Sequence, residues 1–449
     1  MGTLLVRDIH TLATMDAARR ELHDAAIYVR DHAIVAVGHL GDMPAATADR
    51  VIDGRRHVVL PGLVNTHHHL FQSLTRALAQ DADLFTWLRT LYPVWARLTA
   101  EAAYVSAKVG MAELMLSGCT TTSDHLYLFP NDVRLDDTIR AGRDMGMRLH
   151  ATRGAMSVGE SAGGLPPDAL VEKEDAILAD TRRVIEAYHD AGRFAMTRVA
   201  VAPCSPFSVS RELMRDAAVL ARSYGVGMHT HLAENDHDVA YSLERFGCRP
   251  GAFAESVGWT GPDVWHAHCV KLDDAEIERF ARTHTGVCHC PGSNLRLGSG
   301  RAPLARMRSA GLRVGIGVDG SASNDSAHML AEARLALLLS RVAGDTAAVS
   351  ARDALELATL GGASVLNRDD IGAIAPGMAA DIVGFRLDTP ALAGALHDPV
   401  AALLLCAPSG VDFSIIDGAL RVSDGQLVRH ELPALLERHH ALSRQMLAG

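Results

Sequence analysis

The sequence lacks several features that would place a protein in a class at once. It has no stretch of about 18 uninterrupted apolar residues, so we expect no membrane-spanning helix. The first residues, MGTLLVRDIHTLATMD, show neither the basic start, the apolar core nor the cleavage site of a secretory leader. A net charge of −10 without a basic cluster argues against nucleic acid or an anionic membrane as partner. We therefore expect a cytoplasmic protein.

Cysteine and lysine are also scarce. The seven cysteines are an odd, scattered set in a chain of 449 residues, which favours reduced thiols over a disulfide framework. Lysine occurs only at Lys108, Lys173 and Lys271, so nearly all of the 43 basic residues are arginine. Histidine is the opposite case, because it occurs 23 times and three copies follow one another in LVNTHHHLF.

The order of segments predicts an α/β fold. From residue 58 onward, eight short β-rich segments alternate with helical patterns, for example residues 167–192 and 210–225, which both end at glycine. Eight such units over about 270 residues suit a closed (β/α)8 TIM barrel, and an open doubly wound sheet is the alternative. The eight segments are residues 58–69, 118–125, 147–154, 198–206, 225–234, 264–270, 286–294 and 313–325.

The two ends of the chain differ from the middle. Residues 3–57 and 381–428 carry β-type alternation with turn signals, which predicts a small β-sandwich built from both termini. We place the domain boundaries at residues 1–60 for the first part of the sandwich, 61–370 for the barrel and 371–449 for the second part with a terminal helix. That helix, ELPALLERHHALSRQMLA, is expected to expose His439 and His440.

Polar residues at the predicted strand ends indicate a metal site. Reactive groups of such barrels lie at the carboxyl-terminal ends of the strands. Because side chains alternate along a strand, His67 and His69 point the same way and His68 points away. His231, His268 and Asp319 close strands five, six and eight. Imidazoles with one carboxylate and an open position describe a hydrolytic site for one divalent ion, Zn²⁺ or Fe²⁺.

Other readings of these residues stay open at this point. A histidine pair on a strand can belong to the core, and His229 and His266 fit hydrogen-bonding residues of a lower layer. Cys288 and Cys290 flank His289 like a metal knuckle, but no second such pair occurs, so buried thiols are favoured. A non-catalytic, metal-stabilised binding protein is the alternative of a different class.

The motifs PGLVNTHHH, HLAE, AHC and GVDGSASN, followed by DIGAIAPGMAADIVGF, resemble the amidohydrolase superfamily over nearly the whole chain. Strand four, RVAVAPCSP, has no lysine, so a pair of metal ions bridged by a carboxylated lysine is not expected, and the resemblance is to the single-metal aminohydrolases. It implies that His67, His69, His231 and Asp319 hold the metal. It further implies that Asp319 accepts a proton from water, that Glu234 protonates the substrate ring and that His268 orients the nucleophile.

The loops between strands refine the expected chemistry. Residues 74–99, 151–168, 202–210 and 288–300 resemble deaminases of purines, pterins and hydroxylated triazines. This implies hydrolysis of 8-oxoguanine to urate and ammonia, with isoxanthopterin or hydroxyatrazine as alternative substrates, and leaves a homo-oligomer open. We expect substrate contacts from Gln72, Trp87, Arg153 and Cys204. The alternatives are a salt bridge for Arg153, a core position for Trp87 and an inert buried thiol for Cys204.

Overall fold

The structure, a computed structural model, describes residues 2–342 and 344–448. Its centre is a closed barrel of eight parallel strands, which confirms the predicted fold and excludes the open sheet. Each β-rich segment identified in the sequence overlaps one barrel strand, and β10, β11 and β12 each extend one residue beyond the expected segment at one end. In order around the barrel these are β8 (Leu63–Asn65), β10 (Cys119–Leu126), β11 (Arg148–Ala155), β12 (Thr197–Pro203), β13 (Met228–Leu232), β14 (Val264–His268), β15 (Gly286–His289) and β16 (Arg313–Ile316).

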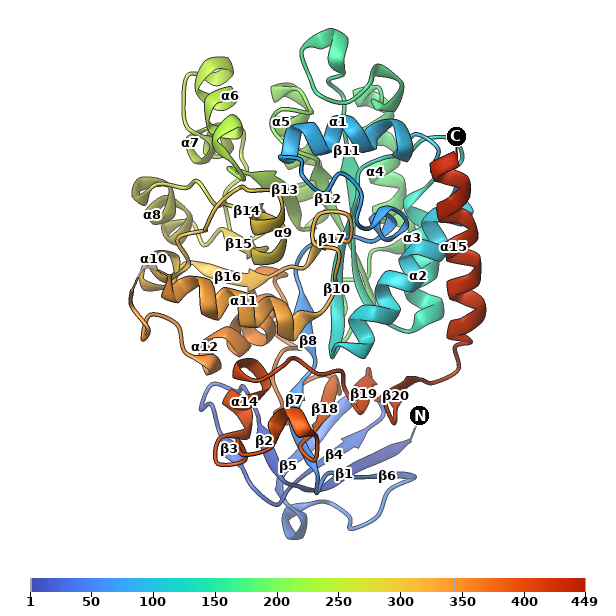
Figure 1. The fold of residues 1–449 in the computed structure, drawn as a ribbon, viewed down its shortest axis with the longest axis vertical. Helices are drawn as coiled ribbons and strands as arrows, with labels where there is room; N and C mark the ends of the chain where they lie inside the picture. Colours follow the sequence, from blue (N-terminus) through green and yellow to red (C-terminus); the bar gives the residue numbers. More distant parts are fainter. Residues whose placement is uncertain (1, 343, 449) are drawn as a thin grey trace.

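Helices surround the barrel (Figure 1). In α5 (Arg211–Tyr224) the Ser210 side chain caps the first turn by accepting from the Leu213 amide, and the helix ends at Gly225, as its pattern predicts. The expected end of α4 (Glu174–Tyr188) at Gly192 is wrong, because the backbone turns extended at His189. The other longer helices are α1 (Leu84–Trp95), α2 (Ala100–Leu116), α3 (Leu135–Met145), α6 (Asp236–Phe246), α8 (Asp274–Arg282) and α11 (Met329–Arg341).

Shorter elements complete the barrel and its loops. Strands β9 (His68–His69) and β17 (Asp319–Gly320) pair in parallel above the barrel, and the 3-10 helix η2 (Leu70–Thr75) follows β9. The short helices are α7 (Pro250–Ser256), α9 (Pro291–Arg296), α10 (Leu304–Ser309), α12 (Ala351–Glu356), α13 (Gly362–Val365) and α14 (Pro399–Leu405). No helix in the part of the chain that the structure describes is long and apolar enough to span a bilayer.

A β-sandwich from both termini lies at the opposite end of the molecule from α1 (Figure 1). The domain boundaries at residues 60 and 370 stay a prediction. One sheet has the order β5 (Ala33–His39), β4 (Ala25–Arg30), β1 (Thr3–Ile9) and β6 (Arg50–Asp53). The other has the order β21 (Gln426–Leu427), β20 (Ala419–Ser423), β19 (Phe413–Ile416), β18 (Ile382–Arg386), β7 (His57–Pro61), β2 (Thr11–Ala13) and β3 (Glu21–Leu22).

The link from sandwich to barrel is very short. β7 of the sandwich ends at Pro61 and β8 of the barrel begins at Leu63, so Gly62 alone separates them. A Cβ atom at Gly62 would lie 2.0 Å from Oγ1 of Thr120, so only glycine lets the chain pass so close to β10. The first barrel strand, with the histidines that follow it, is therefore a direct continuation of the sandwich.

The terminal helix α15 (Leu432–Ala448) belongs to the barrel in space. It runs along α2 and η2 (Figure 1). His439 is buried, with Nε2 3.0 Å from Oγ of Ser73 in η2, whereas His440 is exposed. The expected exposure of His439 is therefore wrong, because the helix packs on the loop region of the barrel and turns this side chain inward.

A buried ion pair between Arg148 and Asp381 joins the barrel to the sandwich at the amino-terminal end of β11. Arg148, the first residue of β11, donates from Nε and Nη2 to the two carboxylate oxygens of Asp381, over 3.0 and 3.1 Å. Nη1 donates to the carbonyl of Ala195 over 2.9 Å. Both charged side chains are buried, so each depends on the other for its compensation.

We predict that Arg148→Ala lowers the free energy of unfolding by about 3 to 5 kcal/mol, because it leaves the Asp381 carboxylate buried without its cationic partner. Urea denaturation of both proteins measures the change. The control is Arg386→Ala, which removes an exposed pair with Asp388 and should leave the midpoint close to wild type. Equal midpoints for the two variants would contradict this role of Arg148.

Candidate metal and active site

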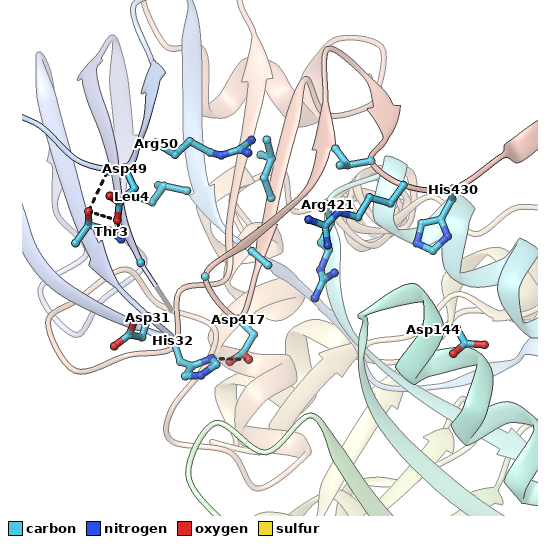
Figure 2. A pocket seen from close by; sticks show the side chains of 16 residues that line it. Thr3, Leu4, Asp31, His32, Asp49, Arg50, Asp144, Asp417, Arg421 and His430 are labelled. Carbon is cyan, nitrogen blue, oxygen red and sulfur yellow. Dashed lines mark hydrogen bonds and ion pairs between the residues drawn. The ribbon is translucent and has the colours of Figure 1, made fainter.

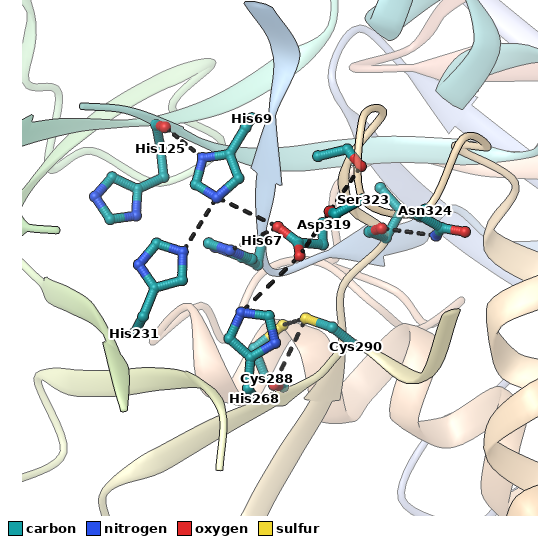
Figure 3. Close-up of polar contacts among 12 residues, drawn as sticks. His67, His69, His125, His231, His268, Cys288, Cys290, Asp319, Ser323 and Asn324 are labelled. Carbon is teal, nitrogen blue, oxygen red and sulfur yellow. Dashed lines mark hydrogen bonds and ion pairs between the residues drawn. The ribbon is translucent and has the colours of Figure 1, made fainter. Parts of the chain in front are cut away.

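The predicted ligands meet at the carboxyl-terminal mouth of the barrel. His67 and His69 follow β8, His231 lies on β13, His268 ends β14 and Asp319 begins β17. Nε2 of His67 and Nε2 of His69 lie 3.2 and 3.3 Å from Oδ1 of Asp319. Nε2 atoms of His69 and His231 are 3.1 Å apart. Figure 3 shows the five side chains facing a common centre.

Hydrogen bonds at Nδ1 fix the tautomer and the orientation of these imidazole rings. Nδ1 of His69 lies 2.7 Å from the His125 carbonyl oxygen, and Nδ1 of His231 lies 2.6 Å from the Cys204 carbonyl oxygen. A carbonyl oxygen only accepts, so Nδ1 carries the proton in both rings. Each Nε2 is then left with a lone pair directed at the centre, which is the state that a metal ion binds.

His67 reaches the same state through another imidazole. His229 Nδ1 lies 2.9 Å from the Trp265 carbonyl oxygen, so this nitrogen carries the proton of His229. Nε2 of His229 is consequently the acceptor for Nδ1 of His67, at 2.7 Å. The lone pair of His67 therefore lies on Nε2, toward Asp319. This places His229 in the hydrogen-bonding layer beneath the ligands, as its alternation along the strand indicates.

The donor set fits a divalent ion. Ligand atoms of His67, His231, His268 and Asp319 lie within 4.8 Å of one another. Among the described residues, Nε2 of His67 and Oδ1 of Asp319 are buried polar atoms without a hydrogen-bond partner, which is unfavourable unless another group binds there. Burial lowers the pKa of His231 to about 3, so its ring is neutral at pH 7 and available as a ligand.

Two further groups stand beside the ligands. Burial and then the charge of Asp319 raise the pKa of Glu234 to about 8, so the Glu234 carboxyl holds a proton at neutral pH. Its Oε2 lies 3.5 Å from Nε2 of His268. His268 is oriented by Asn294, whose Oδ1 lies 2.9 Å from Nδ1. A proton-holding carboxyl and an oriented imidazole next to a ligand group are suited to general acid catalysis.

A cavity opens onto this centre. It is lined by Glu234, His268, Asp319 and three of the four expected substrate contacts, Gln72, Trp87 and Cys204, together with the side chains of Leu84, Leu88, Tyr92, Phe207 and Leu297. Oε1 of Gln72 is buried without a partner among the described residues, so it offers an acceptor. Nε1 of Trp87 already donates a hydrogen bond to the Ala322 carbonyl.

The structure contradicts the expected substrate contact of Arg153. Its guanidinium donates to Glu172 over 2.8 and 2.9 Å and to Asp180 over 2.9 Å, and it packs on the Phe129 ring. It does not line the cavity. The salt-bridge alternative is therefore correct, because two carboxylates outside the cavity hold the side chain.

Sequence reasoning missed two neighbours of the site. His125 lies on β10, its carbonyl accepts from Nδ1 of His69, and its ring lies beside that of His231, with 4.9 Å between ring centroids. Tyr127 lines the cavity and accepts a hydrogen bond from Nε2 of Gln72 over 3.3 Å. His125 had a signal, since it is the last residue of the β-rich segment 118–125. Tyr127 follows the strand and had none.

The alternative metal ligands stay apart from the centre. Sγ of Cys288 and Sγ of Cys290 lie 3.5 Å from each other and both thiols are buried, but neither belongs to a ligand group found among the described residues. Lys271, on the loop after β14, pairs with Asp236 over 3.0 Å, and no lysine lines the described cavity. The thiols are thus buried core residues, and a lysine bridge is absent from the described part of the site.

A wider cavity lies where the sandwich meets the barrel (Figure 2). Arg50, Arg421 and His430 line it together with Asp144 and Asp417. Its acids are already engaged, since Asp417 lies 2.7 Å from His32 and Asp144 accepts from Tyr104. Charges of both signs line this cavity without a convergent ligand set, so the chemistry lies at the barrel mouth.

Comparison with known proteins agrees with this geometry. A closed β/α barrel with an imidazole and carboxylate group at its mouth defines a barrel hydrolase with a metal-binding site. The amidohydrolase family model matches residues 58–420, and the chain belongs to this family.

Individual relatives cover nearly the whole chain. The 8-oxoguanine deaminase of Pseudomonas aeruginosa is 47% identical over 98% of both chains. The hydroxydechloroatrazine ethylaminohydrolase of Pseudomonas sp. (strain ADP) is 39% identical and covers 100% of this chain and 97% of its own. The solved atrazine chlorohydrolase of Arthrobacter aurescens TC1, complexed with zinc, is 35% identical, with a TM-score of 0.93 over 98% of this chain and 100% of that chain.

We predict that the purified protein holds about one equivalent of a divalent metal. His231→Ala should lose it, because the substitution removes one Nε2 lone pair from the centre. Metal analysis after gel filtration measures the content. The control is the double variant Cys288→Ser, Cys290→Ser, which should keep the metal. Retention by His231→Ala together with loss in the serine variant would move the site to the thiols.

Proposed function

We propose that this chain is a hydrolytic deaminase of an aminated purine-like heterocycle, and that it converts 8-oxoguanine and water to urate and ammonia. The observation that carries the proposal is Glu234, a buried carboxyl with a raised pKa that lines the same cavity as the ligand group. Hydrolysis of an amine on a heterocycle needs an attacking water and an acid for the ring nitrogen. The 47% identity to an 8-oxoguanine deaminase supports the particular substrate.

His67, His69, His231 and Asp319 would hold one divalent ion, Zn²⁺ or Fe²⁺. When bound, such an ion lowers the pKa of a water molecule from about 15.7 to about 7. Neutral imidazoles and a carboxylate are ligands that both ions accept. Zinc is favoured because the related atrazine chlorohydrolase was solved with zinc.

The side chains divide the proton transfers. Asp319 takes a proton from the attacking water, and Oδ2 of this residue is held by Oγ of Ser323 at 3.1 Å. Glu234 gives its proton to the ring nitrogen beside the attacked carbon. His268 stands between the two carboxyls and orients the water. The carbon gains the water oxygen, the proton taken up by Asp319 passes to the exocyclic nitrogen, and the bond from this nitrogen to the carbon breaks to release ammonia. The ring nitrogen keeps the proton from Glu234, and the second proton of the water restores Glu234.

Recognition would come from the cavity wall. Gln72 offers an acceptor for a ring N–H, and Tyr127 holds the amide of Gln72 in place. Trp87 and Phe207 provide apolar surface for a planar ring. The Cys204 thiol is buried, which raises its pKa to about 12, so it would meet the substrate as a neutral group.

The substrate is tested by steady-state kinetics on 8-oxoguanine, guanine, isoxanthopterin and hydroxyatrazine, with the metal content measured on the same sample. We expect ammonia release with the highest kcat/KM for 8-oxoguanine. Preference for isoxanthopterin, or ethylamine release from hydroxyatrazine, would keep the reaction class and replace the substrate. No turnover of any compound by metal-loaded protein would contradict the enzyme and favour a binding protein.

Glu234→Gln should lower kcat by about 10²- to 10⁴-fold, because the amide cannot give up a proton. Glu234 acts in its protonated form, so kcat/KM is highest below its pKa and declines as pH rises through it. We expect an apparent pKa at or below about 8, the value that the buried Glu234 side chain has without a bound cation, since a cation favours the carboxylate. Residual activity of the glutamine variant should lack this alkaline decline. An unchanged pH profile in that variant would assign the decline to another group.

A further inference from the structure

Glu332 on α11 is a buried carboxylate that the proposed reaction does not use. It is 2% exposed and forms no ion pair with any residue that the structure describes. Burial raises its pKa to about 7. A buried carboxyl group without a cation is unfavourable unless hydrogen bonds compensate it. Both of its oxygens accept such bonds, and the two donors lead toward different parts of the site.

The first donor belongs to the loop that carries Asp319. Nδ2 of Asn324 donates to Oε1 of Glu332 over 2.8 Å and to the Val318 carbonyl over 2.7 Å, directly before Asp319. Asp319 has φ of 59°, in the left-handed region that non-glycine residues rarely adopt. Such a backbone persists only where neighbouring contacts hold it. Figure 3 shows Asn324 on the same loop as Asp319 and Ser323.

The second donor belongs to α9. The Gly292 amide donates to Oε2 of Glu332 over 2.9 Å. A Cβ atom at Gly292 would lie 2.5 Å from Oε1 of Glu332, so only glycine allows this approach. Two residues further on, Asn294 holds Nδ1 of His268. His268 also has a left-handed backbone, with φ of 69°.

We propose that Glu332 is a positioning residue that fixes Asp319 and His268 relative to each other. It does so by bonding at once to the loop of the carboxylate and to the helix whose asparagine orients the imidazole. Neither residue is touched by Glu332, so its effect passes through Asn324 and Gly292. This inference rests on the proposed function, in which Asp319 and His268 act on the same water.

Glu332→Gln tests this role, because the amide keeps one acceptor and replaces the other by a donor. We expect kcat to fall about 10- to 100-fold, since misplacement by about 1 Å can reduce a rate 10²-fold, while KM stays within about twofold. The matched control is Glu276→Gln on α8. Glu276 is equally buried and accepts from the Gly251 amide over 2.7 Å, but it pairs with Arg249 away from the cavity. This control should keep wild-type kcat.

A second variant, Asn324→Ser, tests the same connection from the loop and does not alter α11. Because both variants break one network, the double variant should be no slower than about the slower single variant. Losses in kcat that multiply would overturn the inference. So would wild-type kcat in folded Glu332→Gln, or an equal loss in Glu276→Gln.

A spectroscopic readout separates this inference from the proposed function. Cobalt-substituted wild type and Glu332→Gln should bind equal amounts of metal but differ in their visible absorption, because Asp319 is a proposed ligand. This comparison needs no turnover, so it holds even if every substrate of the panel fails. Identical spectra would overturn the positioning role, whereas absence of turnover by wild type would overturn only the proposed function.

Discussion

The site depends on lone pairs that converge on one point inside a protein. An imidazole contributes such a lone pair only if its other nitrogen is protonated and held. The carbonyls of His125 and Cys204 impose this on His69 and His231, and His229 imposes it on His67. The barrel supplies these acceptors because neighbouring strands end at the same height. The backbone carbonyls of β10 and of the segment after β12 therefore also decide which ring nitrogen of His69 and His231 carries the proton.

Rigid strands alone do not place every group. His268 and Asp319 have left-handed backbones at the points where the chain leaves the barrel, and the ordinary β geometry would direct their side chains elsewhere. Side-chain hydrogen bonds from the loops hold these positions, by Ser323 and Asn324 near Asp319 and by Asn294 at His268. His67, His69 and His231 are each held at Nδ1 by an acceptor on or directly after another strand, whereas the two residues with left-handed backbones are held by side chains of the loops.

The meeting of the polar side chains at the barrel mouth could be predicted from the sequence because it follows from topology, whereas the choice of metal ligands among them is implied by the family resemblance and stays a prediction. Once eight parallel strands are recognised, residues at their ends must meet, and alternation decides which of His67, His68 and His69 turn inward. Arg153 could not be assigned in this way, since its partners lie beyond the strand, Glu172 in the loop before α4 and Asp180 on α4, and the alternation along β11 does not place them. His439 was misplaced because an amphipathic pattern does not say which surface a helix covers.

Contacts that depend on loops needed the structure for the same reason. Tyr127 enters the cavity just after β10, and Glu332 reaches the site through the Asn324 side chain and the Gly292 backbone amide. A residue that acts through intermediates leaves no local pattern in the sequence. The substrate-facing wall and the supporting contacts are consequently the parts of the site that sequence reasoning describes least well.

Because only Gly62 separates β7 of the sandwich from β8 of the barrel, the terminal sheets affect the position of the candidate site. β7 pairs with β18 on one side and with β2 on the other. His67 lies six residues after Pro61, the last residue of β7. Local unfolding of the β-sandwich would therefore loosen β8, the strand that is followed by His67 and His69. The β-sandwich, although distant from the barrel mouth, thus holds in place the strand on which the positions of His67 and His69 depend.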